Sequence, residues 1–186
     1  MQALVRFVLV ASIFSALAGA AHAAPYTIDQ KQAEVRFSYT FPLSSGIGRF
    51  TSVEGTADID DAALARTTVE AVIDTRTLRA SVQMAQDELR GADFFDVANY
   101  PQMRFKSRSV RPKTATTGEM TGDMTIKGIT RPIALNVTLQ PPADGGARAF
   151  RATTRINRND FNMTAYAFLV GETVDIEIRA VLVPAK

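Results

Sequence analysis

Apolar and polar residues alternate along most of this chain, with apolar side chains at every second position. The pattern is clearest in six stretches, residues 35–41, 103–107, 120–126, 133–139, 150–156 and 174–182. A two-residue period is typical of a β-strand that buries one face. Residues 49–59 and 67–73 are predicted as two more strands, and residues 42–48, which include two glycines, are predicted to interrupt the chain between strands.

One window follows a helical period instead. Val82, Ala85 and Leu89 are three and four residues apart, and polar residues occupy the opposite side. Ser81 is expected to cap the start of this short helix, and Gly91 stands where a helix commonly ends. The sequence therefore predicts one amphipathic helix in an otherwise β-rich chain.

Two adjacent aromatic residues follow the predicted helix. Phe94 and Phe95 lie between Asp93 and Asp96, and the segment closes on Pro101. Pro101 has no N–H to donate to a strand ladder, so this segment is not a central strand. Two neighbouring phenylalanines need apolar surroundings, so it is not an ordinary solvated loop either. We expect a helix end and a tight turn that plug one side of a β structure.

The number of strands favours a closed sheet. The pattern predicts about eight antiparallel strands with short connections, and it shows no internal repeat or domain linker. A sheet of this size with one apolar face closes most easily into a barrel. The expected fold class is all-β, an antiparallel eight-stranded barrel with one short helix. A two-sheet sandwich is the competing architecture.

The N-terminal residues have the features of a targeting segment. Arg6 is followed by an apolar run at residues 7–17, and the tripeptide at residues 21–23 (AHA) fits a small-residue cleavage site. The run is too short to span a bilayer comfortably, which disfavours an uncleaved anchor. We expect a signal peptide at residues 1–23 and one exported domain at residues 24–186, with no integral membrane segment after cleavage.

Composition excludes several kinds of chemistry from the exported domain. The single histidine, His22, lies in the predicted signal peptide, and the chain has no cysteine. Ser-His-Asp and Cys-His triads, thiolate chemistry and zinc sites with histidine or cysteine ligands are therefore excluded. Acids and bases are interspersed and the net charge is only +2, which gives no electrostatic footprint for nucleic acid.

The acidic residues around the aromatic pair suggest two further sites, and neither is favoured. Asp93 and Asp96 could form a carboxylate pair for glycoside hydrolysis, but acids three residues apart at a helix end more often cap or solvate the helix. With Asp87 they could hold Ca²⁺, but the EF-hand spacing is missing. We predict no catalytic residue, no metal site and no cofactor, apart from a bound lipid or isoprenoid.

The predicted inner face of the barrel is rich in aromatic and methionine side chains. An eight-stranded barrel is either filled by its side chains or keeps a cavity for one small ligand. Periodicity alone favours a filled core, whereas flexible methionines suit an adaptable apolar surface. The candidate lipid-binding residues are Phe37, Tyr39, Phe41, Phe94, Phe95, Met103, Phe105, Met124, Leu135, Val137, Phe150 and Ile176. Arg49 and Arg158 are the candidates for a head group at the barrel mouth, with a solvated strand end as the alternative for each.

Two segments carry a family resemblance. Residues 86–105 (QDELRGADFFDVANYPQMRF) and residues 122–137 (GDMTIKGITRPIALNV) resemble the YceI family of exported, lipocalin-like proteins. Further landmarks match in order at residues 26–29, 48–50, 158–161 and 170–176, so the resemblance covers the whole exported domain. It implies an elongated lipocalin-like barrel whose apolar tunnel binds a long-chain amphiphile, typically a polyisoprenoid or quinone-like lipid. It also implies a periplasmic or secreted protein.

The chain departs from the family pattern where the family often has histidines. Gln32-Ala33 stands in place of a His-Ser pair, Thr40 or Phe41 replaces a histidine after the first long strand, and residues 86–89 contain none. A head-group or metal role of those histidines therefore does not transfer to this chain. The implied tail-binding barrel is unaffected.

Three function classes remain open at this point. The expected one is a periplasmic binding or carrier protein for a long-chain lipid or isoprenoid quinone. The alternative is a protein–protein interaction module of the cell envelope with a filled barrel core. An enzyme acting on a lipid is disfavoured, because its acid–base group would have to be an aspartate or a tyrosine inside the tunnel. The sequence identifies neither the lipid nor its head group, and it leaves open whether two barrels pair as a homodimer.

Overall fold

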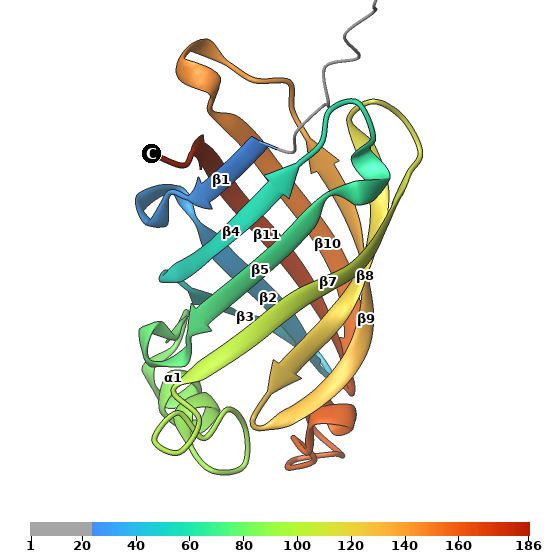
Figure 1. Ribbon diagram of the computed structural model, residues 1–186. Helices are drawn as coiled ribbons and strands as arrows, with labels where there is room; N and C mark the ends of the chain where they lie inside the picture. The colour runs from blue at the N-terminus through green and yellow to red at the C-terminus, as the bar shows by residue number, and fades with distance from the viewer. Residues whose placement is uncertain (1–23) are drawn as a thin grey trace, which may run out of the picture.

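The computed structural model describes residues 24–186, and the predicted signal peptide lies outside the described residues. Within these residues, eleven β-strands form one antiparallel sheet (Figure 1). The strands are β1 (Ala24–Ile28), β2 (Glu34–Phe41), β3 (Ser44–Phe50), β4 (Val53–Ile59), β5 (Thr68–Asp74), β6 (Arg79–Ala80), β7 (Gln102–Pro112), β8 (Thr117–Ile126), β9 (Ile129–Leu139), β10 (Arg148–Asn157) and β11 (Thr173–Pro184). One α-helix, α1 (Gln83–Arg90), lies between β6 and β7 in the chain.

Eight of these strands close into a barrel. Hydrogen-bonded neighbours follow the order β1-β4-β5-β7-β8-β9-β10-β11, and β1 pairs again with β11. Tyr26 of β1 lies opposite Ala57 of β4 and opposite Pro184 of β11. This second pairing closes the sheet on itself, so the fold is the predicted barrel and not a sandwich.

Strand β11 has different partners along its length. Residues 182–184 pair with β1, whereas residues 175–179 pair with β2. The sheet continues from β2 to β3 and then to the two-residue strand β6. Helix α1 contacts β6 and lies at the end of the barrel where this extension is found (Figure 1). We call this the α1 end.

Both ends of the described chain lie at the opposite end of the barrel. The N–H of Ala185, just after β11, donates to the carbonyl of Pro25 in β1 over 2.9 Å. We call this the terminal end. The segment that leads into the start of β11 lies at the α1 end instead, as Figure 1 shows in orange and red.

Alternating burial along the strands matches the predicted pattern. In β8, every second residue is buried from Gly118 to Ile126, and the residues between them are half-buried. Met103 and Phe105 of the neighbouring strand β7 are buried in the same way. Side chains of alternate residues point to the same face of a sheet. The apolar stripe of the sequence is therefore the inner wall of the barrel.

Strand β3 corrects one prediction. The sequence predicts an interruption at residues 42–48, but residues 44–50 form β3 and pair one to one with β2. Position 48 of this strand holds glycine because the ring of Phe37, its partner on β2, occupies the place where a side chain would stand. The predicted interruption is thus limited to the turn at residues 42–43, and a second one falls between β3 and β4, so the single strand predicted at residues 49–59 is two strands.

Helix α1 confirms the predicted helix but not its predicted cap. The helix starts at Gln83 after Val82, whose side chain makes no capping hydrogen bond, so Ser81 is not the cap. Gly91 ends the helix as expected. Leu89 is buried in the main core, so packing of this one face holds the helix in place.

Candidate functional site

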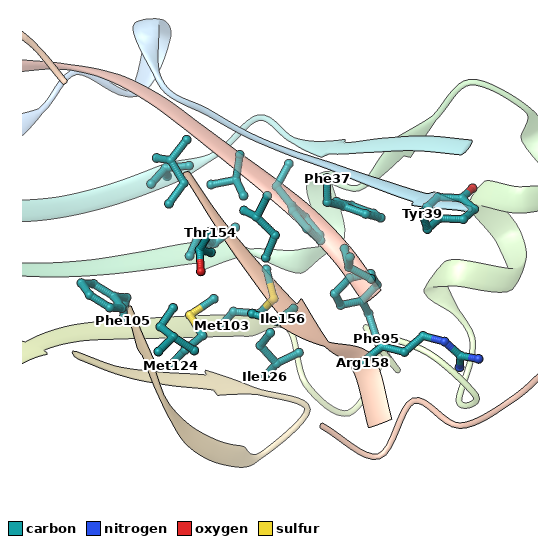
Figure 2. Close-up of a pocket in the computed structure, with 18 of the residues that line it drawn as sticks. Phe37, Tyr39, Phe95, Met103, Phe105, Met124, Ile126, Thr154, Ile156 and Arg158 are labelled. Atoms are coloured by element: carbon teal, nitrogen blue, oxygen red, sulfur yellow. The ribbon is translucent and has the colours of Figure 1, made fainter. Parts of the chain in front are cut away.

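The interior of the barrel holds a cavity of about 540 Å³. This volume lies in the range of small-molecule sites, roughly 300–1,000 Å³. Most of its lining side chains are apolar, and they come from the barrel strands, from β2 and β3, and from segments at the α1 end. Figure 2 shows several of them facing one shared space.

The cavity reaches the surface at the α1 end. Five of its large hydrophobic lining side chains are also exposed, namely Phe41, Val82, Met84, Tyr166 and Leu169. Phe41 ends β2, the next two residues lie at the start of α1, and the last two lie in the segment before β11. We call this opening the mouth.

Most of the predicted lipid-binding residues lie around this cavity. Eleven of the twelve line it: Phe37, Tyr39, Phe41, Phe94, Phe95, Met103, Phe105, Met124, Leu135, Phe150 and Ile176. Val137 lies instead at a second, smaller cavity of about 50 Å³. Nine of these eleven residues lie in strands and follow the two-residue period, whereas Phe94 and Phe95 lie between α1 and β7.

The two arginines predicted for a head group have different locations. Arg158 lines the cavity. Arg49 lies exposed in β3, where its guanidinium is 3.7 Å from the carboxylate of Glu34. Of these two arginines, Arg158 is therefore the one that lies at the cavity.

An aromatic cluster forms part of the wall near the mouth. The ring of Phe95 lies 5.5 Å from that of Phe37 and 5.1 Å from that of Phe50, and the rings of Phe37 and Phe50 are 5.5 Å apart. Tilted and edge-on contacts at these distances stabilise a cluster beyond simple burial. The predicted plug is thus packed into the barrel core, and its ring is also part of the cavity wall.

Glycines in β3 give the aromatic rings of β2 room to lie against the wall. A Cβ atom on Gly48 would overlap the ring of Phe37, and one on Gly46 would overlap the ring of Tyr39. Each ring occupies the space above its glycine partner on the neighbouring strand. Flattened against the sheet, these rings leave the centre of the barrel free.

The polar groups at the cavity are few. They belong to Tyr39, Thr56, Glu88, Thr154, Arg158 and Tyr166. Burial raises the pKa of the Tyr39 phenol, and a hydrogen bond to Glu88 raises the pKa of the Tyr166 phenol. Both phenols therefore stay neutral at physiological pH. Within residues 24–186, no group of three or more acidic or histidine side chains is placed to hold a metal ion.

Arg158 is a buried cation beside the apolar wall. It is 2% exposed. Its Nε donates to the carbonyl of Gly171 over 3.1 Å and its Nη2 to that of Val170 over 3.0 Å, and its Nη1 donates to the carbonyl of Met163. Burial lowers the pKa of its guanidinium, against the nearby charge of Glu172, and the group stays protonated. Its hydrogen-bond donors thus hold the backbone of the segment before β11.

Sequence reasoning missed this segment as part of the site. Met163, Tyr166, Leu169 and Val170 line the cavity, although none of them belongs to a strand. The available signal was an apolar run at residues 163–170 that contains no charged residue and does not alternate. Such a run outside a strand needs apolar surroundings, as the aromatic pair after α1 does.

We expect Phe95→Leu to lower the free energy of unfolding by roughly 1–2 kcal/mol, because it removes two ring contacts and some buried volume. Urea denaturation followed by circular dichroism measures this loss. Met84→Ala is the matched control, since Met84 is 77% exposed and its loss should change stability by about 0.5 kcal/mol or less. Equal midpoints for Phe95→Leu and the unmodified protein would contradict a plug that is packed into the core.

Sequence comparison identifies relatives over nearly the whole described chain. A family model described as the YceI-like domain matches residues 26–182. A UPF0312 protein of Vibrio cholerae is 34% identical over 167 residues, which are 86% of this chain and 87% of the relative. The protein YceI of Escherichia coli is 34% identical over 168 residues, 87% of each chain.

Solved structures show the same barrel. BcnA of Burkholderia cenocepacia is similar with a TM-score of 0.76 and 25% identity, over 83% of this chain and 98% of that one. A polyisoprenoid binding domain from Saccharophagus degradans is similar with a TM-score of 0.67 over 88% of this chain and 100% of that one, and at 14% identity this likeness concerns the fold alone. Together with the family match and the curated relatives, these findings establish that the chain belongs to the YceI-like domain family.

Proposed function

We propose that this protein binds a long-chain amphiphile, such as a polyisoprenoid or quinone-like lipid, inside its barrel and carries it in the periplasm. The observation that carries the proposal is the apolar cavity of about 540 Å³ with an opening at one end. Each methylene group moved from water into such a site contributes roughly 0.8 kcal/mol. A lipid chain therefore gains affinity with every unit that fits inside. The solved relative from Saccharophagus degradans is described as a polyisoprenoid binding domain, which supports the same class of ligand.

The proposed orientation places the lipid tail in the barrel and the head group at the mouth. The deep wall is formed by apolar side chains such as Met103, Phe105 and Met124, which suit a tail. Arg158 supplies a positive charge at the cavity, and each of its three nitrogens donates one N–H to a backbone carbonyl. Two of its five N–H groups make none of these bonds, so it would attract an anionic or strongly dipolar head group through its charge and could offer it these remaining donors.

The proposal is binding without catalysis. Of the polar groups at the cavity, the Thr154 hydroxyl donates to the carbonyl of Ala134 over 2.7 Å and the Tyr166 phenol donates to Glu88 over 3.2 Å. A general acid–base group works best with a pKa near the operating pH, whereas the pKa values of both cavity phenols are raised. These features favour a carrier over an enzyme that acts on the lipid.

The proposed location rests on the N-terminal sequence. Residues 1–23 have the charge, the apolar run and the small-residue site of a signal peptide, so we infer export and cleavage before Ala24. Within residues 24–186, no helix is both long and apolar enough to cross a membrane.

Extraction of the purified protein with organic solvent, followed by mass spectrometry, tests the proposal. We expect a long-chain lipid in the extract, and we expect the delipidated protein to take up a fluorescent isoprenoid chain. A protein that releases no lipid and takes up neither isoprenoid nor fatty chains would contradict the proposal. That result would favour the alternative of an envelope interaction module, although the size of the cavity weighs against the filled core which that alternative assumes.

A further inference from the structure

Exposed apolar side chains are concentrated around the mouth. Within residues 24–186, seven of the nine exposed large hydrophobic residues lie on three segments, residues 41–43, 82–84 and 166–169. We call these three segments the mouth rim. A soluble surface normally carries such side chains singly, and their accumulation at one place marks an interaction site.

The three segments of the mouth rim are joined to each other. The Tyr166 phenol donates to Glu88 of α1 over 3.2 Å, and the Tyr166 ring stacks on that of Phe94 with 6.0 Å between centroids. On the other side, the N–H of Gly171 donates to the carbonyl of Thr40 in β2 over 2.9 Å. The segment before β11 thus connects helix α1 with the tip of β2, and the rim surrounds the opening.

The three segments of the mouth rim and the residues next to them along the chain are uncharged. Residues 40–48, 80–86 and 161–171 lack aspartate, glutamate, lysine and arginine, although charged residues make up 22% of the chain. A surface that binds anionic lipid or an acidic protein needs basic residues. The charged side chain bonded to the rim is Glu88, which accepts from the Tyr166 phenol and, being acidic, gives no attraction for anionic lipid. An apolar rim without basic residues of its own suits a neutral lipid surface instead.

Two side chains extend beyond the cavity wall. Leu43, in the turn between β2 and β3, is 100% exposed, and Phe168, in the segment before β11, is 99% exposed. Neither lines the cavity. Isolated apolar tips on separate turns need a complementary pocket in a protein partner, but they enter the acyl region of a bilayer without one.

We propose that the mouth rim docks on the surface of a neutral lipid bilayer, with Leu43 and Phe168 inserted among the acyl chains. Phe41, Met84 and Leu169 belong to both the rim and the cavity wall, so the docked cavity opens directly into the apolar layer of the membrane. A lipid tail then passes between membrane and barrel without crossing water. This transfer of a lipid tail rests on the proposed function, whereas the docking itself depends only on the mouth rim.

Flotation of the protein with phosphatidylcholine vesicles tests the docking. The protein should float with neutral vesicles, to the same extent in low and in high salt. Leu43→Ser and Phe168→Ser should each weaken vesicle binding about tenfold or more, and the double variant should not float. Tyr100→Ser is the matched control, because Tyr100 is an exposed large hydrophobic residue outside the mouth rim and its neighbouring residues, 37% exposed, and it should float normally.

Uptake of a fluorescent isoprenoid from solution separates the two proposals. The double variant should keep this uptake, since neither residue lines the cavity. Vesicle binding by a protein that takes up no lipid would uphold docking and contradict the carrier function. Lack of vesicle binding, equal flotation of the double variant, or binding that requires anionic lipid and is lost in high salt would each overturn the docking. Self-association that the double variant abolishes, without flotation, would assign the rim to a second copy of the chain and overturn it as well.

Discussion

Replacing Gly48 with alanine is expected to weaken uptake of a fluorescent isoprenoid at least tenfold while the barrel stays folded. The new methyl group would overlap the ring of Phe37, and the three atoms nearest to it all belong to that flexible side chain. The ring must therefore turn away from the β3 wall, and the space next to it is the cavity that it lines. Overpacking of this kind costs roughly 1–3 kcal/mol of stability, which a folded barrel can tolerate.

A second substitution distinguishes a blocked cavity from a damaged fold. Adding Phe37→Leu to Gly48→Ala removes the displaced ring, so the double variant should recover most of the uptake lost by Gly48→Ala alone. Titration of each variant with the fluorescent isoprenoid measures uptake, and circular dichroism checks folding. Normal uptake by folded Gly48→Ala, or no recovery in the folded double variant, would show that the position of the Phe37 ring does not control the cavity.

Arg158→Met is expected to lower the free energy of unfolding by about 4 kcal/mol. Methionine fills similar space but leaves the carbonyls of Met163, Val170 and Gly171 without the donors that Arg158 supplies. A buried acceptor that loses its partner costs about 1–3 kcal/mol, and three of them lose it here. The segment before β11 should loosen first, because these bonds hold its backbone. Chemical denaturation should show the loss as a midpoint lower by about 1–2 M urea.

Two controls bear on the role of Arg158. Arg155→Met removes an arginine near the end of β10, three residues before Arg158, but Arg155 is 70% exposed and pairs with Asp175 at the surface, so its loss should cost less than about 1 kcal/mol. Arg158→Lys keeps the charge but offers a compact donor group, so its stability should fall between those of the unmodified protein and Arg158→Met. If Arg158→Met unfolds at the same urea concentration as Arg155→Met, the buried hydrogen bonds contribute little.

The inner wall of the barrel was predictable because strand geometry imposes it on the sequence. Side chains two residues apart share a face, so the apolar stripe of β8, including Met120 and Met124, could be assigned without a structure. Strand β3 could not be assigned in this way. The role of Gly48 depends on the ring of Phe37 opposite to it, and pairing between strands is not visible in the residues of one segment.

Most of the mouth could not be predicted from the sequence. Its residues come from the tip of β2, the start of α1 and the segment before β11, which are far apart in the chain. All three segments lack charged residues, but this indicates a shared surface only when the fold brings the segments together. Arg158 was predicted as a head-group contact at the barrel mouth, with a solvated strand end as the alternative. The chain does not reveal that its donors would be directed at three backbone carbonyls.

The adjacency of the two chain ends has a practical consequence. Pro25 and Ala185 are joined by a backbone hydrogen bond at the terminal end, and the length of β11 separates them from the mouth. A fusion partner, an affinity tag or a surface tether attached at either end of residues 24–186 would therefore stand away from the opening. The barrel could be immobilised through either end with its mouth facing outward, and joining the two ends with a short linker would permit new ends to be placed in a turn elsewhere.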